Sequence, residues 1–134
     1  MEITEQLHAK GLKSTPLRSS LMKIFQDHHS PLSAEELESK LKGLDYDPAS
    51  LFRCLKKFTE AQLIRVVDLG EGFHRFESIC HVHSHHHHVM CNSCKKIETI
   101  PFCIPKEIET HLKKTGYSHL THRMDFFGLC GSCS

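Results

Sequence analysis

The chain has 134 residues, with 17 basic and 16 acidic side chains for a net charge of +1, and 39% of its residues are hydrophobic. These values are typical of a globular protein with one ordinary domain or two small lobes, and they exclude a disordered or fibrous chain. No apolar run approaches the about 20 residues that span a bilayer, and the first residues lack the apolar core of a secretory leader, so we expect a cytoplasmic protein without a membrane partner.

The first 76 residues have the pattern of three helices followed by a β-hairpin. A helix is expected after each of the capping residues Thr15, Ser33 and Asp47, and the third helix ends near residue 61. This order is that of a winged helix-turn-helix, whose third helix enters the major groove of DNA. The two expected strands cover residues 63–67 and 73–76, with a glycine-rich turn at 70–72.

Basic residues cluster in two places of this near-neutral chain. The third predicted helix carries Arg53, Lys56 and Lys57, with no acidic residue between positions 50 and 58, and a second cluster lies between positions 10 and 23. Local clusters of this kind are typical of a protein that docks one face on a polyanion. We therefore predict DNA binding through the third helix. The alternatives are solvated helix faces and a helical hairpin that binds no ligand.

The character of the chain changes after residue 78. We predict an α+β fold, with a winged-helix DNA-binding domain over residues 1–78 and a metal-binding dimerisation domain over residues 79–134. A lobe of about fifty residues is too small to be stable by itself and needs a metal or a partner subunit. Within it the sequence predicts strands at 85–91 and 95–100, a helix at 105–114 and a loose alternation over 119–129.

Four cysteines of the second region form two Cys-x-x-Cys pairs, Cys91 with Cys94 and Cys130 with Cys133. Two such pairs have the spacing of a tetrahedral zinc site with four thiolate ligands. Because a four-thiolate site has no open position for a water nucleophile, we predict a structural zinc ion. The alternatives are a redox pair and unmodified thiols.

A run of histidines precedes the first cysteine pair. On a β-strand, alternate side chains point to opposite faces, so this run can supply two separate metal sites. A thiolate beside imidazoles favours Zn(II) over Fe(II) or Mn(II). The alternative is a polar loop that binds metal adventitiously. The first predicted site combines His86 and His88 with Cys80 and a carboxylate from Glu77 or Asp68, and the second combines His85 and His87 with His122 and Glu107.

The histidines also raise the question of an enzyme. Residues 81–86 resemble the HxHxDH signature of metallo-β-lactamase-like hydrolases, but His85 stands where that signature needs aspartate, and that fold needs a far longer chain. We therefore predict that the protein is not an enzyme and has no small-molecule substrate. Two further cysteines, Cys54 and Cys103, are expected to be packed thiols rather than metal ligands.

Five stretches of the chain resemble those of the ferric uptake regulator family of bacterial metal-sensing repressors. They are residues 11–18 (GLKSTPLR), 33–37 (SAEEL), 50–55 (SLFRCL), 61–64 (AQLI) followed by 68–70 (DLG), and the histidine run that leads into Cys91 and Cys94. Three positions depart from the family's usual pattern: Phe52 replaces a tyrosine, Cys54 a threonine and His87 an acidic residue.

The resemblance implies a homodimer in which each chain has a winged-helix domain and a dimerisation domain. Bound metal would favour the arrangement in which both recognition helices fit successive major grooves. By family position, Arg53 contacts bases, whereas Lys13 and Arg18 contact phosphates. The predicted DNA-binding residues are Lys13, Arg18, Ser50, Arg53, Lys56 and Lys57.

The resemblance also implies two sensing sites in addition to the structural one. In the hinge site, Cys80 matches the extra thiolate of zinc-sensing members, and His28 or His29 substitutes for a histidine usually found before the second helix. The implied hinge ligands are Glu77, Cys80, His86 and His88. The implied ligands of the second site are His85, His87, Glu107 and His122, with Glu109 as the competitor of Glu107.

We therefore predict a zinc-responsive transcriptional repressor of metal-uptake genes, with structural and regulatory Zn(II). Within the same family, the alternative is an iron or manganese sensor or a peroxide sensor, with Fe(II) or Mn(II) as the regulatory metal. An alternative of another class is a metal-buffering protein with no role on DNA.

Overall fold

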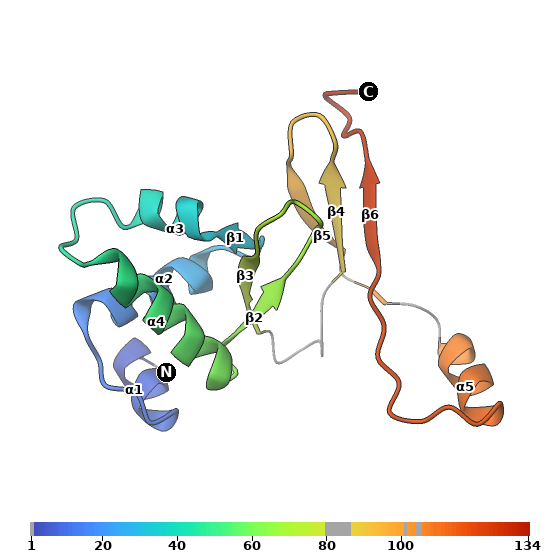
Figure 1. The fold of residues 1–134 in the computed structure, drawn as a ribbon, viewed down its shortest axis with the longest axis horizontal. Coiled ribbons are helices and arrows are strands. Elements are labelled where there is room, and N and C mark those ends of the chain that lie inside the picture. The colour runs from blue at the N-terminus through green and yellow to red at the C-terminus, as the bar shows by residue number, and fades with distance from the viewer. Residues whose placement is uncertain (1, 80–86, 101, 104–105) are drawn as a thin grey trace. The chain divides into compact units, whose positions relative to one another are not determined.

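The computed structural model describes residues 2–79, 87–100, 102–103 and 106–134. The chain forms two compact units, a first unit of residues 1–81 and a second unit of residues 82–134 (Figure 1). Three predicted metal ligands, Cys80, His85 and His86, lie outside the described residues.

The helices of the first unit begin where side chains satisfy the free backbone N–H groups of the first turn. Thr15, Ser33 and Asp47 each accept such a hydrogen bond, so the three predicted helix starts are confirmed. The preceding helix, α1, was not predicted, because it has only seven residues and no side-chain cap at its start. The four helices are α1 (Ile3–Ala9), α2 (Pro16–Asp27), α3 (Ala34–Lys40) and α4 (Pro48–Glu60).

A three-stranded antiparallel sheet completes the first unit, in the order β1-β3-β2. The turn between β2 and β3 is longer than predicted, since the second strand begins at Arg75 rather than at residue 73. Gly70 and Gly72 in this turn both have positive φ (76° and 88°). These elements make a winged helix-turn-helix, with the β2–β3 hairpin as the wing. The strands are β1 (Leu32–Ser33), β2 (Ile64–Val67) and β3 (Arg75–Ser78).

Arg75 fastens the wing to the helices. Its guanidinium donates to both carboxylate oxygens of Glu71, at 2.7 and 3.0 Å, and to the backbone oxygen of Pro31 at 3.3 Å. It also forms an ion pair with Glu36 of α3, and it lies 5.4 Å from the centre of the Phe73 ring. The side chains of Arg75 and Glu71 are 9% and 11% exposed, so this ion pair is largely withdrawn from water.

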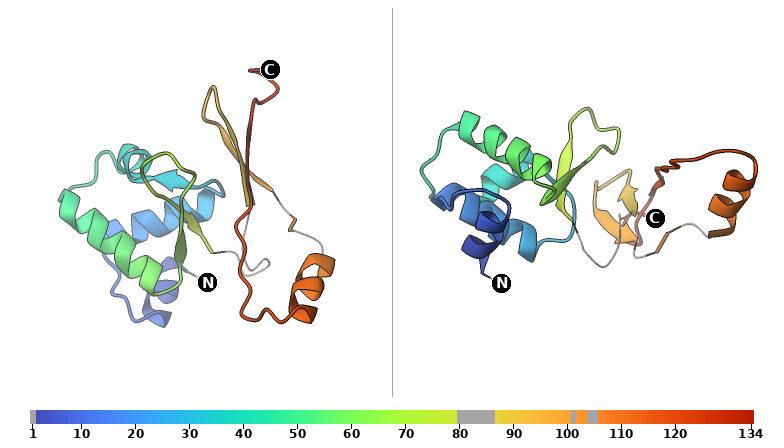
Figure 2. Two further views of the ribbon diagram at one scale, coloured as in Figure 1. Left: turned by 45° about the vertical axis from the view of Figure 1, so that its right-hand side comes forward. Right: turned by 90° about the horizontal axis from the view of Figure 1, so that it is seen from below.

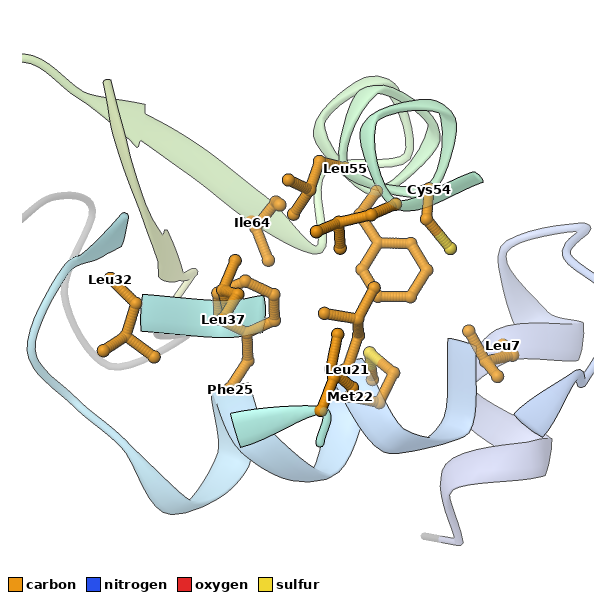
Figure 3. Packing of buried hydrophobic residues seen from close by; sticks show 12 residues of the cluster. Leu7, Leu21, Met22, Phe25, Leu32, Leu37, Cys54, Leu55 and Ile64 are labelled. Carbon is orange, nitrogen blue, oxygen red and sulfur yellow. The ribbon is translucent and has the colours of Figure 1, made fainter. Parts of the chain in front are cut away.

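The core of the first unit lies between α2, α3, α4 and the sheet (Figure 3). Leu21 and Phe25 of α2 face Leu55 of α4, and Ile64 of β2 lies at the same centre. Each such buried side chain contributes about 1.5–3 kcal/mol relative to an exposed one. This core therefore holds α4, the predicted recognition helix, with residues of the first unit alone.

The second unit is built on a sheet in which β4 is the central strand. It is antiparallel to β5 and parallel to β6. In both further views the helix α5 stands apart from these strands (Figure 2), and none of its nine residues, all of them described, is buried. The elements are β4 (His87–Cys91), β5 (Ile97–Ile100), α5 (Lys106–Lys114) and β6 (Asp125–Gly128).

Large apolar side chains of the second unit face solvent. They lie before and on α5, after it, and on and beyond β6, and most are about half exposed or more. Exposed large apolar side chains such as these are commonly covered at protein–protein interfaces. These residues, called here the apolar face, are Phe102, Ile108, Tyr117, Phe126, Phe127 and Leu129.

The architecture confirms the predicted α+β class and the winged helix-turn-helix. Among the described residues, no helix is long and apolar enough to cross a membrane.

Candidate metal centres and DNA-binding face

The four cysteines of the two Cys-x-x-Cys pairs meet at one end of the second unit's sheet. Their sulfur atoms all lie within 4.8 Å of one another, and the Sγ atoms of Cys94 and Cys130 are 3.8 Å apart. Thiolates about 2.3 Å from a zinc ion, at tetrahedral angles, are about 3.8 Å apart. All four cysteines are free thiols. The arrangement therefore has the dimensions of a tetrahedral four-thiolate site.

Hydrogen bonds from backbone N–H groups favour the thiolate form of Cys91. The N–H groups of Cys130 and Cys94 donate to its sulfur, at 3.4 and 3.5 Å, and lower the pKa of the Cys91 thiol to about 6. The pKa of Cys133 is instead raised to about 11, chiefly by its hydrogen bond with the Cys130 sulfur. Four thiolates at this distance repel one another, so ionisation of the whole set requires a bound cation.

A second cluster lies at the opposite end of β4 and consists of His87, Cys103 and His122. The distances His87 Nε2 to Cys103 Sγ, Cys103 Sγ to His122 Nε2 and His122 Nε2 to His87 Nε2 are each 3.1 Å. These residues come from the start of β4, the segment after β5 and the segment before β6. The strand order β5-β4-β6 thus brings together three possible ligands that are far apart in the sequence.

The hydrogen bonding of His87 orients its imidazole for metal binding. Nδ1 lies 3.1 Å from the carbonyl oxygen of Met124, which can only accept, so Nδ1 carries the proton and the lone pair of Nε2 points to the cluster. Burial, and next the charge of His122, lower the pKa of His87, so the imidazole is neutral at neutral pH. A neutral imidazole with one N–H bonded to a carbonyl is the usual form of a histidine ligand.

The composition of this cluster differs from the predicted one. His87 and His122 are together, but the interpretation of Cys103 as a packed thiol is wrong, because Cys103 is exposed and contacts both histidines. Glu107 and Glu109 lie in the first turn of α5 and are not in the cluster. His85 lies outside the described residues. Cys54, by contrast, is buried as predicted, and burial raises the pKa of its thiol.

The described residues of the predicted hinge site have polar neighbours. Glu77 is buried on β3 with its Oε1 2.9 Å from Arg65 Nε, and His88, buried on β4, has its Nδ1 3.9 Å from Asp125 Oδ1. Asp68 accepts a hydrogen bond from the N–H of Gly70 in the wing turn. The other candidates, His28 and His29, follow the end of α2. The hinge set as a whole stays a prediction.

The helix α4 presents the predicted recognition residues to solvent. Leu51, Cys54, Leu55 and Phe58 are buried on one side of the helix, which leaves Phe52, Arg53, Lys56 and Lys57 exposed. Ser50 Oγ accepts a hydrogen bond from Arg53 Nη2 at 3.0 Å and donates to Asp47 at 3.2 Å. A chain of contacts thus holds the guanidinium near the start of the helix.

A hollow of about 420 Å³ lies between the start of α2 and the face of α4, and Arg18, Arg53 and Lys57 all line it. Arg18 donates a hydrogen bond to the backbone oxygen of Lys13 at 3.0 Å, which ties the loop before α2 to that helix. Four of the six predicted DNA-binding residues line this hollow, namely Arg18, Ser50, Arg53 and Lys57. Lys13 is bonded to Arg18, and Lys56 lies next to Lys57 on α4.

The chain is similar to proteins that regulate transcription in response to metals or peroxide. It is 27% identical to the ferric uptake regulation protein of Bacillus subtilis, with 98% of this chain and 92% of that protein covered. It is also 27% identical to the peroxide operon regulator of the same organism, with 99% and 92% covered. Among solved structures, the iron-containing ferric uptake regulator of Francisella tularensis matches with a TM-score of 0.75 and 26% identity, over 92% of this chain and 95% of that chain.

A sequence model of the ferric uptake regulator family matches residues 9–127. The match covers most of both units, the whole of α4, and the first cysteine pair, Cys91 and Cys94. The resemblance noted in the five sequence stretches is therefore confirmed, and the chain belongs to the ferric uptake regulator family of metal-responsive transcription regulators.

Proposed function

We propose that the protein is a zinc-responsive transcriptional repressor that binds operator DNA as a homodimer and controls metal-uptake genes. The observation that carries the proposal is the combination of thiols and imidazoles in the second unit with an exposed basic helix in the first. The four-cysteine cluster holds a structural zinc ion, and separate sites sense the metal. A regulator of this kind works in the cytoplasm, where its operator lies.

Sulfur ligands support zinc as the regulatory metal. Thiolates favour Zn(II), whereas Fe(II) and Mn(II) prefer sites of nitrogen and oxygen. Cys80, which stands beside the histidine run, matches the thiolate of zinc-sensing members of the family. Similarity to the ferric uptake and peroxide regulators of Bacillus subtilis supports the alternative, an iron, manganese or peroxide sensor.

The apolar face supports a homodimer. A unit whose larger apolar side chains remain exposed gains stability when a second copy covers them. The two-fold axis of such a dimer would present one α4 helix to each half of a palindromic operator.

Arg53→Ala is expected to weaken operator binding by about 1–3 kcal/mol, because an arginine that contacts a guanine edge contributes discrimination of that size. The measurement is fluorescence anisotropy with a labelled palindromic duplex at fixed salt, with a scrambled duplex beside it. Lys113→Ala removes the same charge from the exposed face of α5 and serves as the control. Equal effects of the two substitutions would argue against a base contact by Arg53.

The regulatory metal is tested by titrating buffered Zn(II), and separately anaerobic Fe(II), into the protein with an AT-rich palindromic duplex. We expect zinc to drive binding at free concentrations at which iron has no effect, and Cys80→Ser to abolish that response while the fold is retained. Preferential activation by iron would replace zinc in the proposal. If the protein does not bind the duplex at any concentration of either metal, a metal-buffering protein would be favoured.

A further inference from the structure

We propose that Cys103 is a metal ligand, and that with His87 and His122 it forms a regulatory zinc site in which a thiolate replaces the carboxylate expected from the family resemblance. The inference rests on the proposed function in naming zinc as the metal and in calling the site regulatory. The geometry of the three side chains would stand for any thiophilic cation.

The three ligand atoms are close enough together to bind one metal ion, although they lie a few tenths of an ångström closer than the about 3.4–3.6 Å of an ideal zinc tetrahedron. They form a nearly equilateral triangle with sides of 3.1 Å. A zinc ion about 2.1 Å from the two nitrogens and about 2.3 Å from the sulfur would lie about 1.2 Å outside the plane of that triangle. A tetrahedral ion has a fourth ligand in addition to these three.

The protein presents each ligand in a form that accepts a metal. The Nδ1–H of His87 donates to the Met124 carbonyl, so Nε2 carries the lone pair, and the His122 ring stacks on the His87 ring at a centroid distance of 5.0 Å. When the ion binds, the Cys103 thiol loses its proton to solvent and the sulfur forms the bond to the metal. Burial of His87 and exposure of its two partners suit a site that exchanges metal with solvent.

The sulfur atom decides which metal the site selects. A site of two imidazoles and a carboxylate accommodates Fe(II) and Mn(II), whereas a site of two imidazoles and a thiolate favours Zn(II). Cys103 is therefore a specificity-determining residue. It discriminates between metals at a site that lies entirely within the second unit, apart from the predicted hinge site.

The test measures alkylation of Cys103 in the full-length protein that retains one structural zinc ion per chain. Iodoacetamide is added at increasing buffered free Zn(II), and mass spectrometry follows the peptide that contains Cys103. We expect zinc to suppress alkylation of this exposed thiol, because a metal-bound thiolate is shielded from the reagent. In His122→Ala the protection should be lost. His111→Ala, which removes an exposed histidine of α5, should retain it.

Alkylation of Cys103 at the same rate with and without zinc would overturn the proposal. Protection that persists in His122→Ala would overturn the three-residue ligand set. Elemental analysis and circular dichroism of each variant establish that the structural zinc and the fold are intact. None of these measurements involves DNA, so failure of the proposed repressor function leaves their outcome unaffected.

Cys103→Asp tests the role of the sulfur in metal selection. The variant restores a carboxylate, so we expect the ratio of the zinc to the manganese affinity at this site to fall relative to the wild type. Competition for Mn(II), followed by electron paramagnetic resonance, measures that ratio. An unchanged ratio would show that the thiol does not set the preference.

Discussion

Replacing Cys91 by serine is expected to release the structural zinc ion and unfold the second unit while the first unit stays folded. Cys91 is one of the four clustered thiols and accepts hydrogen bonds from two backbone N–H groups. A serine hydroxyl does not ionise and cannot replace the thiolate. Binding of structural zinc is worth about 10–16 kcal/mol in small zinc-dependent peptides, more than a lobe of this size gains from its own core.

Zinc per chain, sedimentation velocity and peptide-resolved hydrogen exchange follow the three expected consequences. We expect loss of the tightly held zinc, loss of the dimer, and rapid exchange in β4 and β6 with slow exchange in α2 and α4. Ser132→Ala is the control, because it changes an exposed side chain of the second Cys-x-x-Cys turn that belongs to neither metal cluster. A Cys91→Ser protein that retains one zinc ion and a stable dimer would contradict the structural role.

Arg75→Met is expected to lower the free energy of unfolding of the first unit by about 3 kcal/mol, because it leaves the largely buried carboxylate of Glu71 without its cation. Arg75 bonds both oxygens of Glu71, pairs with Glu36 and donates to the Pro31 carbonyl, so a single side chain fastens the wing to α3 and to β1. The hydrogen bond to Glu71 is the main cause of the raised pKa of Arg75, which keeps the guanidinium charged.

The measurement is hydrogen exchange of peptides from β3 and α3 in the full-length protein. Lys23→Met is the control, because Lys23 forms an exposed pair with Asp27 on α2, and such pairs contribute about 0–1 kcal/mol. In Arg75→Met with Glu71→Gln, part of the lost stability should return, since one uncompensated charge is gone. Equal destabilisation by Arg75→Met and Lys23→Met would count against the buried pair.

Local signals in the sequence predicted most of the first unit. Thr15, Ser33 and Asp47 indicate helix starts, because a capping side chain bonds a backbone N–H within three residues. The spacing of the apolar residues of α4 likewise indicates its buried side. The two-residue strand β1 carries no such signal, because only its pairing with β3 makes it a strand. The two Cys-x-x-Cys pairs are also a local signal, since their spacing alone indicates a tetrahedral metal site.

The second cluster could be predicted only in part. The histidine run pointed to His87, and the family resemblance to His122, but nothing near Cys103 in the sequence marks it as a ligand. Its role follows from register: β4 pairs with β5 so that His87 lies opposite Ile100, three residues before Cys103. Sheet register depends on the whole unit, so a lone cysteine beyond a strand end could not be assigned before the strands were paired.

The central position of β4 in its sheet implies an order in which the two clusters bind metal. His87 begins this five-residue strand and Cys91 ends it, so one cluster lies at each end. His122 reaches its cluster only when β6 lies parallel to β4, a pairing of distant segments that the four-cysteine cluster holds closed. A newly synthesised chain should therefore fill the cysteine cluster first and the histidine cluster second. Zinc starvation during synthesis would yield chains without a formed regulatory pocket, rather than finished sensors waiting for their signal.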